Sequence, residues 1–130
     1  MIKISKKSQY GLRAMIYLAK NYKSKRVISI KNISEKEGIP FEFLEKIFSQ
    51  LEKSGLVIGK KGVNGGYVLA KSPTKISASD IVFVLEDNKN SVNCALCWKK
   101  NKCVSKSVWA KVDLALNKAL KSITLASLIK

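Results

Sequence analysis

Gly38 and Pro40 divide the first half of the chain into two helical segments. The earlier segment, from Ile30 to Glu37, follows a capping residue at Ser29 and ends at a glycine, which readily adopts the left-handed conformation found at helix ends. Proline suits the first turn of the later segment, which carries apolar residues at helical spacing as far as Lys53. A short helix, a tight turn and a longer helix predict a helix-turn-helix, although an ordinary helical hairpin has the same pattern.

The segment that follows distinguishes these two interpretations. The stretches from Leu56 to Ile58 and from Tyr67 to Ala70 have the character of strands, and the turn between them is rich in glycine and contains Lys60 and Lys61. Glycine lets the backbone turn sharply and approach a phosphate without an intervening side chain. The run lacks the spacing of the nucleotide-binding glycine motifs, and a strand follows it where those motifs have a helix. A hairpin directly after a helix-turn-helix therefore predicts the wing of a winged helix.

The last part of the chain predicts one long amphipathic helix from about Val104 to Leu128, because neither glycine nor proline interrupts it. An apolar face on so small a protein needs cover, and the matching helix of a second copy would supply it. The sequence therefore predicts a homodimer. The residues expected on this face are Val108, Val112, Ala115, Leu116, Ala119, Leu120 and Ile123.

Two further helices complete the predicted architecture. One begins after Ser5 and reaches about Lys20, and a shorter one covers Asp80 to Leu85 after a cap at Ser77 or Ser79. The expected fold is mainly α with a small β wing. It comprises a winged helix-turn-helix DNA-binding domain over residues 1–86, a cysteine-containing sensor loop over 87–103 and a dimerisation helix over 104–130.

The charge balance of the chain points to a polyanionic partner. Lysine and arginine number 25 against 9 aspartates and glutamates, which gives a net charge of +16. Such an excess favours nucleic acid first and an anionic membrane surface second, although a lysine-rich proteome would also produce it. No apolar run is long enough to span a bilayer and no signal peptide is evident, so we expect a cytoplasmic protein with no membrane partner.

Three cysteines, Cys94, Cys97 and Cys103, lie close together, and the chain has no histidine. A clustered, odd set of thiols is not typical of a secreted disulfide framework and indicates a metal centre or reactive thiols. Thiolates select iron–sulfur clusters or zinc, but a structural zinc site needs a fourth ligand that the chain does not offer as cysteine or histidine. Redox-active thiols without metal, a zinc site and cysteines packed as small apolar side chains remain the alternatives.

Three stretches of the sequence, Ser5 to Ala19, Ile33 to Val57 and Gly59 to Lys71, resemble the IscR/NsrR/CymR family of winged-helix transcriptional regulators. The resemblance implies a homodimer held by crossed C-terminal helices, with two recognition helices in successive major grooves of a partly palindromic operator in double-stranded DNA. In many members of this family, a [2Fe–2S] or [4Fe–4S] cluster bound by three cysteines controls DNA affinity, which implies that role for Cys94, Cys97 and Cys103. The most specific matching pieces are Tyr10 to Met15, Leu44-Glu45 and Gly65-Gly66-Tyr67.

The recognition helix, expected from Pro40 to Lys53, would present its N-terminal residues to base edges. Glu45 matches the base-reading glutamate of the family and would accept a hydrogen bond from a cytosine amino group. A solvated helix face with lysine–glutamate pairs is the alternative. The candidate base contacts are Pro40, Phe41, Glu42, Glu45 and Lys46, and the candidate phosphate contacts are Ser5, Lys6, Lys7, Tyr10, Lys60 and Lys61.

The fourth cluster ligand of the family has no counterpart in this chain. One branch of the family uses a histidine where this chain has Lys106, and another uses an acidic residue where this chain has Gln9. Gln9, Ser105 or an external molecule would then complete the site. Two other functions stay open: a metal-free regulator of the same fold that senses thiol redox state or sulfur metabolites, and a thiol-dependent redox enzyme. The enzyme is disfavoured, because the chain offers no histidine and no acid–base pair.

Overall fold

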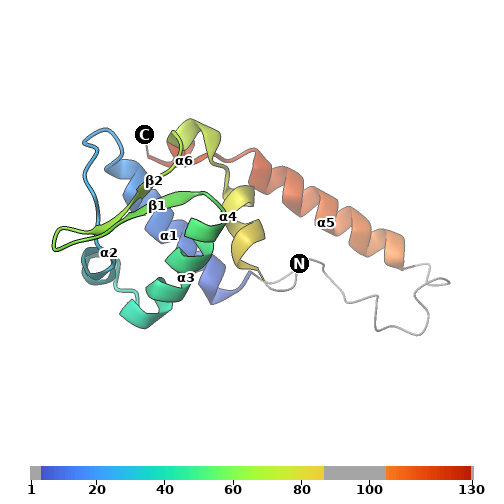
Figure 1. Cartoon of the computed structure of the whole chain (residues 1–130). Helices are drawn as coiled ribbons and strands as arrows, with labels where there is room; N and C mark the ends of the chain where they lie inside the picture. Colours follow the sequence, from blue (N-terminus) through green and yellow to red (C-terminus); the bar gives the residue numbers. More distant parts are fainter. Residues whose placement is uncertain (1–3, 87–104, 130) are drawn as a thin grey trace.

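The computed structural model describes residues 4–86 and 105–129 of the chain. In Figure 1, helices surround a small hairpin to form one body, and α5 projects away from it. This arrangement confirms the predicted class, mainly α with a small β wing. In chain order the elements are α1 (Lys6–Lys20), α2 (Ile30–Glu37), α3 (Phe41–Lys53), β1 (Val57–Lys60), β2 (Gly66–Leu69), the short 3-10 helix η1 (Pro73–Lys75), α4 (Ala78–Leu85), α5 (Lys106–Lys121) and α6 (Leu125–Leu128).

The turn between α2 and α3 forms as the sequence predicts. The Ser29 hydroxyl accepts a hydrogen bond from the Asn32 N–H (3.0 Å), and Gly38 ends α2 in the left-handed conformation, with φ 66° and ψ 34°. Its N–H donates to the Ser34 carbonyl at 2.9 Å. Pro40 lies one position earlier than expected, because it is the residue before α3 and not the first residue within it.

The core lies where α3 packs against α1 and α4. The inner side of α3 is fully buried, and its largest side chain, Phe48, stacks on the ring of Tyr67 in β2 with 4.8 Å between the centroids. Gly11 allows α4 to approach α1, because a Cβ at that position would collide with the side chain of Leu85. The buried residues of α3 are Leu44, Ile47, Phe48 and Leu51.

The two strands form an antiparallel hairpin whose register pairs Val57 with Leu69 and Lys60 with Gly66. β1 starts one residue later than predicted and continues into the glycine-rich segment as far as Lys60, and β2 starts one residue earlier, at Gly66. Ile28 forms a bridge with Tyr67, with hydrogen bonds of 3.0 and 2.8 Å, so the loop before α2 is tied to the wing. A side chain at Gly66 would collide with the Ile28 carbonyl oxygen.

The prediction of one unbroken C-terminal helix is wrong, because α5 ends at Lys121 and a separate turn, α6, follows. The backbone between α5 and α6 bonds to the start of α4 and to the residues just before it. The Ile123 carbonyl accepts from the Ala78 N–H (2.8 Å), and the Leu125 N–H donates to the Ile76 carbonyl (2.9 Å). Leu125 is fully buried. These contacts replace helical hydrogen bonds in a stretch that contains two β-branched residues, Ile123 and Thr124. No helix in the described ranges is both long and apolar enough to cross a bilayer.

The turn at Gly38 gives a test of this local structure. We expect Gly38→Ala to lower the free energy of unfolding by about 1 kcal/mol, because a Cβ strains the left-handed backbone. The space around the glycine is open, so the cost comes from the backbone alone. Urea unfolding of the two proteins measures the difference, and Gly38→Asn, which tolerates this conformation better, should lose less. Equal losses for both variants would mean that the left-handed conformation is not the cause.

Candidate nucleic-acid interface

The outer face of α3 collects the residues that the sequence analysis assigned to base contacts. Since the inner face is buried, the side chains at positions 42, 45 and 46 lie exposed in the first turns of the helix. Pro40 and Phe41, at its start, are also exposed. Lys7 of α1 lines the same shallow grooves as Glu42, Glu45 and Lys46. The structure therefore brings one predicted phosphate contact and the predicted reading residues to a single surface.

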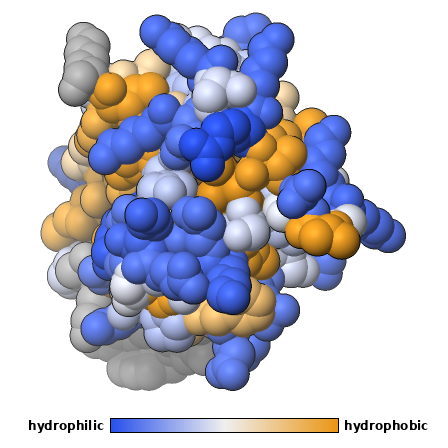
Figure 2. Space-filling view, turned by 90° about the vertical axis from the view of Figure 1, so that its left-hand side faces the viewer, coloured by the Kyte–Doolittle hydropathy of each residue, from blue (hydrophilic) through white to orange (hydrophobic). Residues whose placement is uncertain are grey.

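The wing extends this surface on the other side of α3. Lys60 and Lys61 line a groove together with Phe41, at the start of α3, and Glu52. Lys31, in the first turn of α2, lines the same groove and is exposed, although the sequence analysis did not single it out. Its position directly after the cap of the first helix of the helix-turn-helix is the signal that would have found it. Figure 2 shows this side of the molecule, where hydrophilic residues cover most of the face that carries the wing and α2.

The base of the wing is held next to the acidic residues of α3. The Glu52 carboxylate accepts a hydrogen bond from the Gly59 N–H at 3.1 Å. Burial, together with the negative charges of Glu52 and Glu45, raises the pKa of the Tyr67 hydroxyl above its ordinary value. The tyrosine hydroxyl therefore stays protonated beside α3, and it remains a hydrogen-bond donor.

Two side chains of α1 hold the helix-turn-helix of α2 and α3 in place. The ring of Tyr10 makes an edge-to-face contact with Phe43, with 5.3 Å between centroids. Arg13 donates to the Glu37 carbonyl at the end of α2 and lies 3.5 Å from the Glu37 carboxylate. Arg13 thus has the supporting role that its place one turn after Tyr10 suggests. Among the other predicted phosphate contacts, Lys6 is exposed at the start of α1.

Ser5, another predicted phosphate contact, is engaged by a buried carboxylate. It caps α1 by accepting from the Ser8 N–H (3.2 Å), while its own N–H (3.0 Å) and hydroxyl (2.6 Å) donate to one oxygen of Glu86. The Ser8 hydroxyl donates to the same oxygen, and Glu86 is only 6% exposed. The sequence analysis missed Glu86 because the residue follows an apolar helix and resembles the first position of a loop. The sequence offers no signal for it, since Asp87 follows directly and the two acids look like the start of a polar loop.

The environment of Glu86 keeps it ionised. Burial raises the pKa of this carboxyl, but the hydrogen bonds from Ser5 and Ser8 and the charge of Lys7 outweigh it, so the pKa lies below its ordinary value. A lowered carboxyl pKa stabilises the folded state above the ordinary value of 4.5. That stability is lost as the pH falls through the lower value of the folded protein.

We therefore expect Glu86→Gln to lower the free energy of unfolding at pH 7 by about 1–3 kcal/mol, because a charged acceptor of several hydrogen bonds is removed. The gap between the variant and the unaltered protein should shrink as the pH falls through the folded-state pKa. Urea unfolding at a series of pH values measures both. The control is Glu35→Gln, on the exposed side of α2, which should change stability little at any pH. A gap that stays constant down to acid pH would contradict the role of the charge.

The predicted cluster ligands Cys94, Cys97 and Cys103 lie outside the described residues. Of the two candidates for a fourth ligand, Gln9 is exposed on α1 with its amide nitrogen donating to the Ile4 carbonyl (3.0 Å), and Ser105 is exposed directly before α5. Within residues 4–86 and 105–129, no group of three or more histidine, cysteine or acidic side chains could hold a metal ion.

A helix-turn-helix whose second helix has an exposed polar face beside a basic hairpin defines the class of winged helix-turn-helix DNA-binding proteins. Residues 4–130 match the Rrf2 family, described as an iron-dependent transcriptional regulator, and the chain belongs to this family. It is a transcriptional regulator and not an enzyme, as the sequence predicted.

Relatives and solved structures agree with this assignment. The Rrf2 protein of Nitratidesulfovibrio vulgaris is 31% identical over 99% of this chain and 88% of its own length. IscR of T. potens superposes with a TM-score of 0.80 at 37% identity, covering 98% of this chain and 86% of that one. CymR, the global cysteine regulator of B. subtilis, superposes with a TM-score of 0.83 at 35% identity, covering 99% and 97%.

Proposed function

We propose that the protein is a cytoplasmic, homodimeric regulator that binds a partly palindromic DNA operator and whose affinity is set by an iron–sulfur cluster on Cys94, Cys97 and Cys103. The observation that carries the DNA-binding part is the exposed face of α3, with Glu45 and Lys46 at its centre. Lys7 lies on one side of this face and the wing lysines lie on the other.

Each part of this surface has a distinct task in the proposed complex. Glu45 would accept from a cytosine amino group and Lys46 would donate to guanine or phosphate, while Lys7, Lys60 and Lys61 hold the backbone without reading sequence. Lys31 adds a further cation next to the wing. Because Glu45 is repelled by phosphates, its place at the centre of the face favours a base contact over a backbone contact.

Exposed apolar residues on α5 support the homodimer. One side of this helix is half-buried, and α5 packs against α4. A second stripe at helical spacing, Val108, Val112, Ala115 and Ala119, is exposed, with Val108 at 52% and Val112 at 36%. Nothing in the described part of the chain covers this stripe. The same helix of a second copy would cover it and would place two α3 helices on one duplex.

The donor set of the cysteine segment fits an iron–sulfur cluster. Three thiolates without a histidine match a cluster with one non-thiolate ligand better than a closed zinc site. When bound, such a cluster reacts with oxygen or nitric oxide, and its occupancy depends on the supply of iron. In sequence, the segment joins Glu86, which binds the first turn of α1, to Ser105, which precedes α5. Ordering of this segment would therefore act on both the phosphate-binding end of α1 and the proposed dimer helix.

A second candidate is a metal-free regulator that senses thiol oxidation or sulfur metabolites. The similarity to CymR favours it, since the match spans nearly the whole of that protein, the global cysteine regulator of B. subtilis.

Replacement of all three cysteines separates the two candidates. We expect anaerobically purified protein to be coloured and to contain iron and sulfide, and Cys94→Ser/Cys97→Ser/Cys103→Ser to lose all three properties. The operator affinity of the variant should no longer respond to oxygen, nitric oxide or iron. A control with Ser105→Ala tests whether this candidate ligand is needed. If the unaltered protein is colourless and its DNA affinity still responds to thiol oxidants, the cluster proposal is wrong and the metal-free regulator is supported.

The reading face is tested on an operator selected from a random duplex library. We expect Glu45→Gln to cost about 1–3 kcal/mol on that operator and to relax the preference at one base pair in each half-site. Lys61→Ala should instead weaken binding to all sequences alike. It should also make the dependence of log affinity on log salt concentration shallower, by about the contribution of one phosphate contact per half-site. The assay is a fluorescence titration at several salt concentrations. Unchanged base preferences in Glu45→Gln would remove the residue from the reading role.

A further inference from the structure

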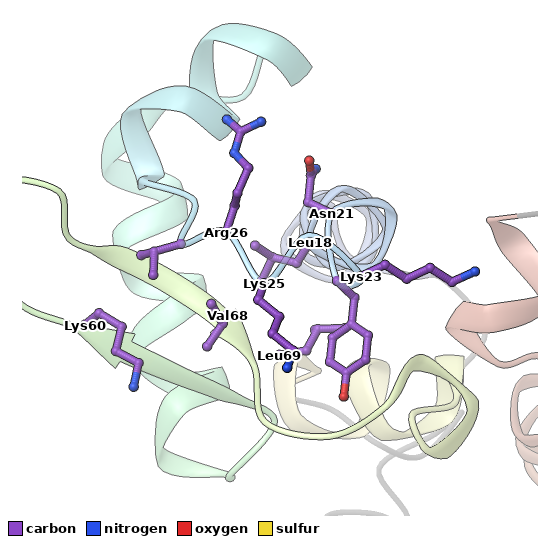
Figure 3. A pocket seen from close by; sticks show the side chains of 10 residues that line it. Leu18, Asn21, Lys23, Lys25, Arg26, Lys60, Val68 and Leu69 are labelled. Carbon is purple, nitrogen blue, oxygen red and sulfur yellow. The ribbon is translucent and has the colours of Figure 1, made fainter.

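A cavity of about 370 Å³ opens between the C-terminal end of α1 and the strand β2, on residues that the proposed DNA complex does not use for reading bases (Figure 3). Its floor is apolar and consists of Leu18, Val68 and Leu69. Leu18 and Leu69 are 3% and 6% exposed and belong to the core, so the floor is rigid. The volume lies within the range of roughly 300–1,000 Å³ that is typical of small-molecule sites.

Four cations and no carboxylate line this cavity. In Figure 3, Lys25 and Lys60 lie on either side of Val68, while the side chain of Arg26 extends toward α2 and that of Lys23 extends away from the floor. The grooves along α3 differ, because each of them contains a glutamate that offsets its lysines. Among the residues that the structure describes, none of these four cations forms an ion pair. The positive charge of the cavity is therefore unopposed, which a lysine-rich surface alone does not explain.

The backbone at Lys25 gives a second reason to regard the cavity as a site. Lys25 has a φ of 56°, and no other residue except glycine has a positive φ in the described part of the chain. Its N–H donates to the Tyr22 carbonyl at 3.1 Å, which closes the turn. Glycine would adopt this conformation without strain, whereas lysine costs about 1 kcal/mol or more. The strained lysine places its charge beside the apolar floor.

We propose that this cavity binds a small amphipathic anion. An aromatic or branched aliphatic body would rest on Leu18, Val68 and Leu69. A carboxylate or phosphate would meet Lys25 at the rim, with Lys60 on the opposite side and Arg26 also lining the cavity. The proposal does not rest on DNA binding or on the cysteine segment, although it shares Lys60 with the proposed phosphate contacts of the wing.

The test uses anilinonaphthalene sulfonate as the probe, with neutral phenylnaphthylamine as the matched compound that lacks the charge. We expect saturable binding of the sulfonate, with changes in amide NMR signals confined to residues 18–27 and 67–69, and much weaker binding of the neutral compound. Displacement of the probe by phenylacetate or by phenyl phosphate then shows which head group the site prefers. Signal changes confined to residues 106–121, equal binding of both probes, or displacement by neither anion would overturn the proposal.

Charge variants test the rim directly. Lys25→Glu/Arg26→Glu should weaken sulfonate binding by about tenfold or more, because two nearby attractions become repulsions. The control Lys111→Glu, on α5, should leave the affinity unchanged. Lys25→Gly removes one charge while relieving the backbone, so it should lower the affinity severalfold without loss of thermal stability. An unchanged affinity in a folded Lys25→Gly protein, or an equal loss in Lys111→Glu, would contradict the site.

Discussion

The stack of Phe48 on Tyr67 is the contact on which the arrangement of α3 and the wing depends. Phe48 is fully buried on the inner side of α3, and Tyr67 lies in β2, so one ring pair joins the helix to the wing. The bridge from Tyr67 to Ile28 then ties the same strand to the loop before α2. Because aromatic pairs of this kind have preferred geometries, the angle between helix and hairpin is fixed before any DNA is bound. The wing is thus held in a defined orientation beside α3.

Local signals made much of this fold predictable. The caps at Ser5 and Ser29, the left-handed Gly38 and the capping box of Ser77 with Asp80 are each decided within a few residues of the chain. The helix-turn-helix and the hairpin could therefore be predicted from the sequence, and the structure brings Lys7 to the same surface as the predicted base contacts.

Features that depend on distant contacts could not be predicted in the same way. The break after α5 results from backbone bonds to Ile76 and Ala78, more than forty residues earlier in the chain, and no glycine or proline announces it. Glu86 meets Ser5 and Ser8 only after α4 has packed on α1 at Gly11. Neither partner is unusual in the sequence, since the signal exists only in their juxtaposition.

The break between α5 and α6 has a mechanical consequence. The C-terminal end of α5 is tied to the segment before α4, while its other end adjoins the cysteine segment. With 16 residues, α5 measures about 24 Å, so a tilt of roughly 10° about residues 122–124 displaces its far end by about 4 Å. The helix is therefore a lever with its pivot on the DNA-binding body. A small change of angle at residues 122–124 would therefore displace Lys106 by several ångströms. Conversely, a force on Lys106 would act as a torque on the contacts of Ala78.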